Sequence, residues 1–238
     1  RPWVKDPDFQ IVESARAEAT GYSFPSGHTQ NAVGTFGGIA RATKRHCLRW
    51  VCVVIFVLVS FSRMYLGVHT PLDVGVSFVI AAVLVFAIYP LMRRADRYPR
   101  LMAGLLASMV LLSAAYLTFT LVYPFPPDID STNLASGVEN GWKLLGATLG
   151  IALAWWLDRQ YVRFETKAVW WVQAIKFIVG LALVVALKAG LKAPLIALFG
   201  GSAGPAGAVR YFLVVLAAGV LWPMAFRPLS RLGQRGEG

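Results

Sequence analysis

Long apolar runs separated by short polar stretches make up most of the chain. We predict seven helices in these runs, at residues 27–44, 48–66, 71–92, 99–123, 140–158, 167–189 and 206–226. A helix needs about 20 residues to cross the hydrocarbon core of a bilayer. The pattern therefore predicts an all-α fold, a polytopic transmembrane helix bundle with about seven membrane helices.

Two stretches depart from this pattern. Residues 27–44 are the least apolar, and their glycines and alanines favour packing against protein rather than against lipid. Residues 191–207, LKAPLIALFGGSAGPAG, are short and interrupted by glycine and proline, so we expect a surface or re-entrant turn there. Gly146 and Gly150 form a Gly-x-x-x-Gly pair, which is typical of close helix packing.

The charge pattern supports a membrane protein and indicates its orientation. Only 15% of the residues are charged, against about 25% in soluble domains, and 57% are hydrophobic. The net charge of +11 comes from four clusters between apolar runs rather than from one basic stripe, so we expect no nucleic acid partner. These clusters contain Arg41, Lys44, Arg45 and Arg49; Arg93, Arg94, Arg97 and Arg100; Arg159, Arg163 and Lys167; and Arg227, Arg231 and Arg235.

The basic clusters fall in alternate loops. Residues 123–140, in the opposite set of loops, contain acids and no Lys or Arg. The positive-inside rule then makes the four clusters cytoplasmic. The polar stretches 21–34 and 62–73 consequently lie on the outer side of the membrane.

The first outer stretch, GYSFPSGHTQNAVG at residues 21–34, has the sequence of a helix N-terminus. Ser26 is the expected N-cap, and His28 falls in the first turn. The unpaired N–H groups and the dipole of such an end favour an anion such as phosphate. The alternative interpretation is a capped helix that begins with a chance histidine.

The second outer stretch, SRMYLGVHTPLD at residues 62–73, predicts another helix start, with Thr70 as N-cap and Pro71 at the first helical position. Asp73 has two interpretations: a capping-box carboxylate, or a hydrogen-bond partner that fixes the tautomer of His69 and stabilises its imidazolium. Arg63 either anchors the helix at the membrane interface or binds two phosphate oxygens through its planar guanidinium group.

The two stretches together place several anion-binding and ionisable groups on the same side of the membrane. Two helix N-termini, the imidazoles of His28 and His69 and the guanidinium of Arg63 are expected on one face of the membrane. If the helices converge, these groups form a constellation for phosphate transfer. Catalysis there would rest mostly on positioning and on charge stabilisation.

These residues resemble the signature of the type 2 phosphatidic acid phosphatase superfamily. That signature has three parts: a Lys and Arg-Pro segment; Pro-Ser-Gly-His; and Ser-Arg, five residues, His, three residues, Asp. Here Pro25–His28 match the second part, Ser62–Asp73 match the third with both spacings, and Arg1 with Pro2 matches the end of the first.

The resemblance covers about residues 1–92. It implies that residues 1–92 are the C-terminal half of a catalytic core, with three core helices and the Lys of the first part upstream. Residues 93–238 are then additional C-terminal transmembrane helices, to which the resemblance assigns no role.

The resemblance also implies a mechanism and its residues. His69 would be the nucleophile and Asp73 its orienting partner, while His28 would protonate the leaving oxygen and later activate water. The implied enzyme is a phosphatase that is independent of metal and works through a phosphohistidine without a cofactor. The phosphate-binding residues would be Arg63, Arg1, Ser26, Gly27 through its N–H group, and Ser62.

Members of this family act on polyprenyl diphosphates, phosphatidylglycerophosphate, phosphatidate and related lipids. We therefore expect a lipid phosphate substrate at the outer face of the cell membrane, either undecaprenyl diphosphate or a glycerophospholipid phosphate. Two alternatives are a lipid phosphotransferase and a non-catalytic protein that binds or transports lipid phosphates.

The C-terminal helices leave two open questions. They are candidates for a homodimer contact, since apolar helices of this kind serve packing or dimerisation more often than a second activity. Lys176 lies well inside an apolar run, where it is either a functional intramembrane charge or a side chain that snorkels to the cytoplasmic interface.

Overall fold

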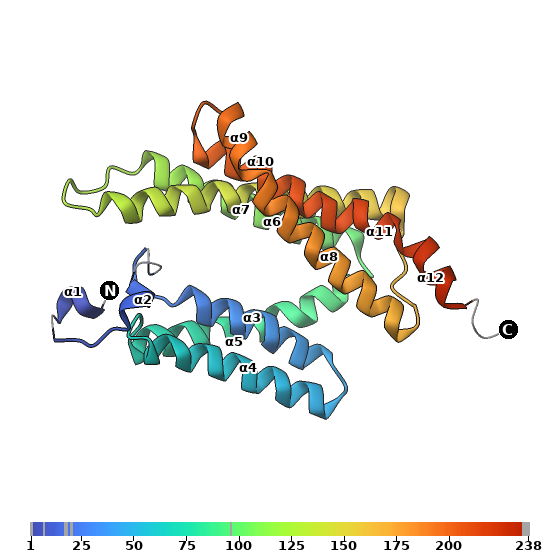
Figure 1. Ribbon diagram of the computed structural model, residues 1–238, viewed down its shortest axis with the longest axis horizontal. Helices are drawn as coiled ribbons and strands as arrows, with labels where there is room; N and C mark the ends of the chain where they lie inside the picture. The colour runs from blue at the N-terminus through green and yellow to red at the C-terminus, as the bar shows by residue number, and fades with distance from the viewer. Residues whose placement is uncertain (1, 7, 17–18, 20, 96, 235–238) are drawn as a thin grey trace. The chain divides into compact units, whose positions relative to one another are not determined.

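The computed structural model describes residues 2–6, 8–16, 19, 21–95 and 97–234, and every regular element within them is helical. Figure 1 shows these helices. Their bounds are α1 Pro2–Lys5, α2 Glu13–Arg16, α3 Gly27–Ala42, α4 His46–Tyr65, α5 Pro71–Ala95, α6 Pro99–Val122, α7 Ser131–Leu157, α8 Trp170–Gly190, α9 Lys192–Leu198, α10 Ala203–Leu216, α11 Trp222–Met224 and α12 Phe226–Gln234. Two π-helical turns, Asp158–Val162 and Ala217–Leu221, extend α7 and α10.

The predicted class, a polytopic all-α protein, is confirmed. Among the described residues, five segments are long and apolar enough to cross a membrane: His46–Tyr65, Pro71–Ala95, Pro99–Val122, Trp170–Leu198 and Ala203–Met224. The predicted number of seven membrane helices is not confirmed, because α3 and α7 are not among these segments. With 16 residues α3 is about 24 Å long, which is shorter than the hydrocarbon core.

Two predicted boundaries are wrong. Helix α7 begins at Ser131 rather than at 140, because the carboxylate of Asp130 caps it by accepting the N–H groups of Thr132 and Asn133 at 2.8 and 3.1 Å. The stretch expected to be a turn, residues 191–207, is largely helical. Its turn is confined to residues 199–202 between α9 and α10, where Gly200 and Gly201 take φ values of 60° and 88°.

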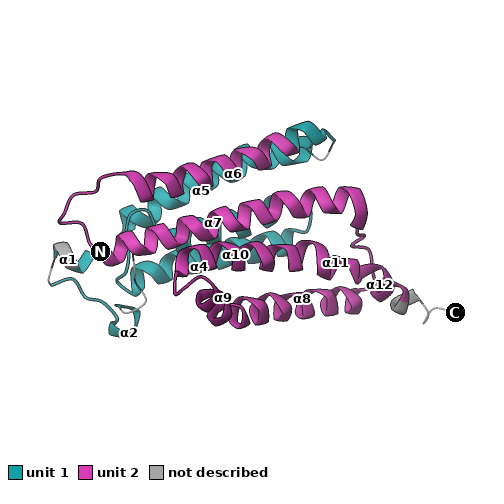
Figure 2. Cartoon of the chain, turned by 90° about the horizontal axis from the view of Figure 1, so that it is seen from above, with its two compact units in different colours: residues 1–102 teal, residues 103–238 magenta. Residues whose placement is uncertain are grey.

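The chain divides into two compact units, residues 1–102 and 103–238, and the division falls inside α6 (Figure 2). In unit 1, helix α3 packs against both α4 and α5. The segment that precedes α2 also reaches the α4–α5 turn, where the N–H of Val12 donates to the carbonyl of Leu66 at 3.2 Å. The N-termini, or mouths, of α3 and α5 are therefore parts of one compact unit.

In unit 2, α7 and α10 run parallel and very close together. Residues of α7 meet residues of α10 in ascending order: Trp142 meets Gly204, Gly146 meets Ala208, and Gly150 meets Val215. A Cβ atom built on Gly146 would overlap the backbone of Ala208. The prediction of close packing at Gly146 and Gly150 is thus confirmed. Both glycines of α7 pack against α10 of the same chain.

The buried Lys176 of α8 is held by the last helix of unit 2. Its Nζ donates to Ser230 Oγ of α12 at 2.9 Å and lies 4.6 Å from the centre of the Phe226 ring. Ser230 in turn donates to the carbonyl of Lys167, just before α8. The ammonium group is therefore turned towards the basic stretch that precedes α8, in the direction that the snorkelling interpretation predicts.

Candidate active site

The first part of the candidate site is the N-terminus of α3. Ser26 caps the helix, and its Oγ accepts from the N–H of Thr29 at 3.5 Å and from Thr29 Oγ1 at 3.1 Å. Both of these side chains are completely buried, whereas Gly27 and His28 are exposed. The predicted cap is confirmed, and it places His28 in the first helical turn at an accessible helix mouth.

The second part is the N-terminus of α5, which has a reciprocal capping box. The N–H of Asp73 donates to Thr70 Oγ1 at 3.2 Å, and the N–H of Thr70 donates to Asp73 Oδ2 at 2.8 Å. The same Oδ2 lies 3.6 Å from Nδ1 of His69, and both side chains are about 95% buried. The two interpretations of Asp73 are therefore compatible: the cap fixes the carboxylate, and the fixed carboxylate faces the imidazole.

A buried junction connects these two helix ends. The N–H of Ser26 donates to the carbonyl of Asp73 at 3.4 Å, and Ser77 Oγ donates to the same carbonyl at 2.8 Å. A site built from both motifs requires the N-termini of α3 and α5 to converge, and this contact shows that Ser26 and Asp73 do. The two helix mouths, with His28 and His69 next to them in sequence, are thus brought together in unit 1.

The end of α4 supplies Ser62 and Arg63, both half-buried in its last turn. Arg63 Nε donates to Ser62 Oγ at 3.3 Å, while Ser62 Oγ donates to the carbonyl of Val59 at 2.7 Å. The carbonyl of Arg63 accepts the N–H of Val68, the residue before His69, at 3.2 Å. Ser62 therefore orients Arg63, and the backbone of Arg63 anchors the turn that carries His69.

Three further residues shape the site, and sequence analysis did not identify them. Gly67 has a φ of 71°, and a Cβ atom added there would overlap the backbone of Gln10. Thr29 and Ser77 are fully buried hydroxyl residues that complete the junction between α3 and α5. Each has a signal in the sequence that could have pointed to it. Gly67 lies inside the five-residue spacer between Arg63 and His69, Thr29 directly follows His28, and Ser77 lies four residues after Asp73.

Arg1 lies outside the described residues. Among the described residues, no group of three or more His, Cys, Asp or Glu side chains is arranged to hold a metal ion.

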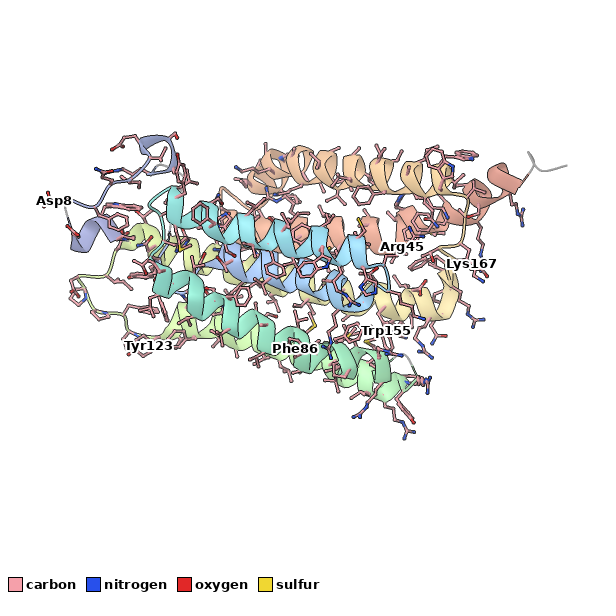
Figure 3. The ribbon with its side chains drawn as sticks, turned by 90° about the horizontal axis from the view of Figure 1, so that it is seen from below. Asp8, Arg45, Phe86, Tyr123, Trp155 and Lys167 are labelled. Atoms are coloured by element: carbon pink, nitrogen blue, oxygen red, sulfur yellow. The ribbon has the colours of Figure 1, made fainter. Side chains whose placement is uncertain are left out.

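The candidate site and a basic cluster lie at opposite ends of unit 1. Asp8, on the segment that leads to the α4–α5 turn, is at one end, and Arg45, between α3 and α4, is at the other (Figure 3). Unit 2 has a similar separation of its own, since Tyr123 lies at one end and Trp155 and Lys167 at the other. Arg45 and Lys167, each in a basic loop, therefore lie at the end of their own unit that is opposite to Asp8 and to Tyr123, respectively.

Two family models match the chain. Residues 1–97 match the PAP2 superfamily, and residues 142–235 match the PAP2 superfamily phosphatase, transmembrane extension. The first match contains every residue of the candidate site. The second match lies within unit 2.

Two curated proteins of Bacillus subtilis (strain 168) are similar to part of the chain. Undecaprenyl-diphosphatase BcrC is 35% identical over 89 residues, covering 37% of this chain and 43% of that protein. Phosphatidylglycerophosphatase B is 32% identical over 99 residues, covering 37% of this chain and 47% of that protein. The chain thus spans less than half of the length of either relative. No solved structure matches.

Proposed function

Because the chain belongs to the PAP2 superfamily, we propose that it is an integral membrane phosphatase that hydrolyses a lipid phosphate or diphosphate. The observation that carries this proposal is the buried junction between the two motifs. This junction joins Ser26, the cap of α3, to Asp73, the partner of His69, and so supports a site that combines His28 with the His69–Asp73 pair. A protein that only bound phosphate would need no buried carboxylate directed at an imidazole.

In the proposed reaction, Nε2 of His69 attacks the phosphorus atom and the bond to the leaving oxygen breaks. Asp73, fixed by its cap and close to Nδ1, stabilises the imidazolium that forms. His28 gives its proton to the leaving oxygen. It then removes a proton from a water molecule, which attacks the phosphohistidine, releases inorganic phosphate and restores His69.

The phosphate would be held by the mouth of α3 and by Arg63. The N–H group of Gly27, an exposed residue, and the positive end of the helix dipole favour the anion. Ser26 is fully buried as the cap, so we propose that it acts by fixing this backbone. Arg63 would supply its planar fork, oriented by Ser62, and Arg1 would add a second guanidinium.

A groove beside the site suits the apolar part of a lipid. It has a volume of about 500 Å³ between α3 and α5. The polar residues Gln30 and Asn31, which follow His28, line one end, and Gly34, Gly38 and apolar residues of α5 line the rest. The names of the two relatives point to undecaprenyl diphosphate and phosphatidylglycerophosphate. We therefore propose a polyprenyl diphosphate or a glycerophospholipid phosphate as the substrate.

The proposal is tested by phosphate release from these lipids in detergent with a chelator present. We expect turnover by the wild-type protein, inhibition by vanadate, and no turnover by a folded His69→Ala variant. Turnover that requires added magnesium would contradict the proposed mechanism. Transfer of phosphate to a lipid or sugar hydroxyl without release would indicate a phosphotransferase, and binding without turnover would indicate a carrier.

We also propose that the site faces the extracytoplasmic side, because Arg45 of the basic loop between α3 and α4 lies at the other end of unit 1. The test is labelling of single cysteines in intact cells in a Cys47→Ser background, since Cys47 is exposed and Cys52 is buried. A cysteine at Ser131 should react with an impermeant thiol reagent, and one at the exposed Arg97 should not. The opposite labelling would place the site on the cytoplasmic side.

A further inference from the structure

Arg210 is a buried charge in the first half of a segment that is long and apolar enough to cross a membrane. It lies in α10, within Ala203–Met224, and only 8% of its surface is exposed. The neighbours on its face of the helix, Gly207 and Val214, are also buried. Its Nε is shut off from solvent and has no hydrogen-bond partner among the described residues.

No carboxylate compensates this guanidinium within the part of the chain that the structure describes. The ion pair of unit 2 joins Lys143 and Glu139 on α7 at 2.9 Å, so Glu139 is already engaged. The stem of Lys143 passes 3.4 Å from a Cβ atom built on Gly207, which lies one helical turn from Arg210. The Tyr211 ring, 5.6 Å from the guanidinium carbon, adds a weak contact. Two cations and one acid therefore share this part of the α7–α10 seam.

A buried Nε–H donor without an acceptor is unfavourable, because it loses water and gains no hydrogen bond in exchange. Ionisable groups inside membrane segments are rare, and they normally mark a binding or transport function. The planar guanidinium group of an arginine can bind two oxygens of a phosphate. The ammonium group of a nearby lysine adds a positive charge that attracts the same anion. The chemistry that fits this excess of positive charge is therefore a phosphate group.

We propose that Arg210, assisted by Lys143, binds a phosphate group in unit 2, as carried by an anionic phospholipid. This binding site contains none of the residues assigned to phosphate hydrolysis. The transmembrane extension would then have a role of its own, which is to anchor the protein to a phospholipid. The other source of the same chemistry is free inorganic phosphate, and the experiment separates the two.

The experiment measures thermal unfolding of the full chain in nanodiscs of phosphatidylcholine alone and of phosphatidylcholine mixed with phosphatidylglycerol. Wild type is compared with Arg210→Gln, Lys143→Gln and the matched control Lys188→Gln, which removes an exposed cation of α8. A parallel arm adds inorganic phosphate to the protein in detergent.

We expect phosphatidylglycerol to raise the Tm of wild type and of Lys188→Gln by about 5 °C at saturation. Arg210→Gln should lose this rise, and Lys143→Gln should lose part of it. A rise caused by inorganic phosphate in detergent, and lost in Arg210→Gln, would identify the free ion as the ligand. An equal rise in wild type and Arg210→Gln would overturn the proposal.

A second measurement covers the case in which Arg210→Gln does not fold. Native mass spectrometry of the wild-type protein should show phosphatidylglycerol retained in preference to phosphatidylcholine, and Arg210→Lys should retain less of it. Equal retention of both lipids by the wild-type protein would also overturn the proposal. If Arg210 had only a packing role, Arg210→Met would leave lipid selectivity unchanged.

Discussion

Units 1 and 2 hold their apolar helices together by different means. In unit 1 most buried polar side chains gather at one end, where Ser26, Thr29, His69, Asp73 and Ser77 connect the mouths of α3 and α5. In unit 2 the closest packing is a glycine-lined seam between α7 and α10. Its buried cations are separated along the chain, one on α8 and one on α10.

This difference indicates where chemistry and stability reside. A buried hydrogen-bonded junction fixes side chains in one arrangement, which is what positioning for catalysis requires. A glycine seam gives close backbone contact and carries no reactive group. Substitutions in the polar end of unit 1 should therefore change rate more than stability, and substitutions in the seam of unit 2 should do the opposite.

The largest effect on rate, apart from loss of the nucleophile, is expected for His28→Ala. A lipid alkoxide is a poor leaving group that needs a proton, whereas nitrophenolate leaves without one. General acid assistance is worth about 10²–10⁴-fold. His28→Ala should therefore lose about this factor on a lipid monophosphate and much less on p-nitrophenyl phosphate. The measurement is the ratio of kcat/KM on the two substrates.

The control for this experiment is His69→Ala, which should lose both activities alike because the nucleophile serves both substrates. Equal losses on the two substrates for His28→Ala would mean that this residue only binds phosphate. The general acid would then have to be another residue.

The next effect is on stability and concerns unit 2. In Gly146→Ala the new methyl group would overlap the Ala208 backbone, so α7 and α10 must separate. We expect a loss of about 3 kcal/mol, the upper end for overpacking, seen as a lower Tm in detergent. Gly104→Ala is the matched control, because no atom lies within 4 Å of a Cβ added there. If the two variants have the same Tm, the seam is not a close contact.

The smallest effect compares matched hydroxyl pairs in the two units. Thr29→Val removes the donor to Ser26 Oγ in unit 1, and Thr148→Val removes the partner of Ser113 Oγ, 2.9 Å away in unit 2. Each should cost about 1 kcal/mol of stability. Only Thr29→Val should also lower kcat, by about 10-fold, because it loosens the cap that positions His28.

Rescue distinguishes a positioning role from a structural one in that comparison. Thr29→Ser keeps the hydroxyl and should recover most of kcat even if it recovers little stability. Equal kcat values for Thr29→Val and Thr148→Val would remove Thr29 from the site.

Much of the fold and of the site could be predicted because local signals are strong in this chain. The caps at Ser26 and Thr70 follow from side-chain chemistry within three residues, and apolar runs locate most of the long helices. The start of α7 was missed because its first turns are polar, and only the cap at Asp130 marks it. The junction through Ser77 could not be predicted, since a serine in an apolar helix shows no partner until α3 and α5 are packed.

The burial of Arg210 and the contacts of Lys176 with Ser230 and Phe226 of α12 could not be predicted from the sequence either. Both depend on which face of a helix meets its neighbour, and this is set by the glycine seam and by α12. A hydropathy pattern records that a charge lies in an apolar run. It does not record whether that charge meets a hydroxyl, a ring or no acceptor.

The most direct test of the central claim, that the two helix mouths form one phosphoryl-transfer site, is trapping of the covalent intermediate. His28→Ala is mixed with a substrate that carries a labelled terminal phosphate and a good leaving group, and the reaction is quenched within its first turnover. We expect a label that is stable to base and labile to acid on the peptide containing His69, and no label in the double variant with His69→Ala. A label on any other residue, or substrate turnover with the double variant, would contradict it.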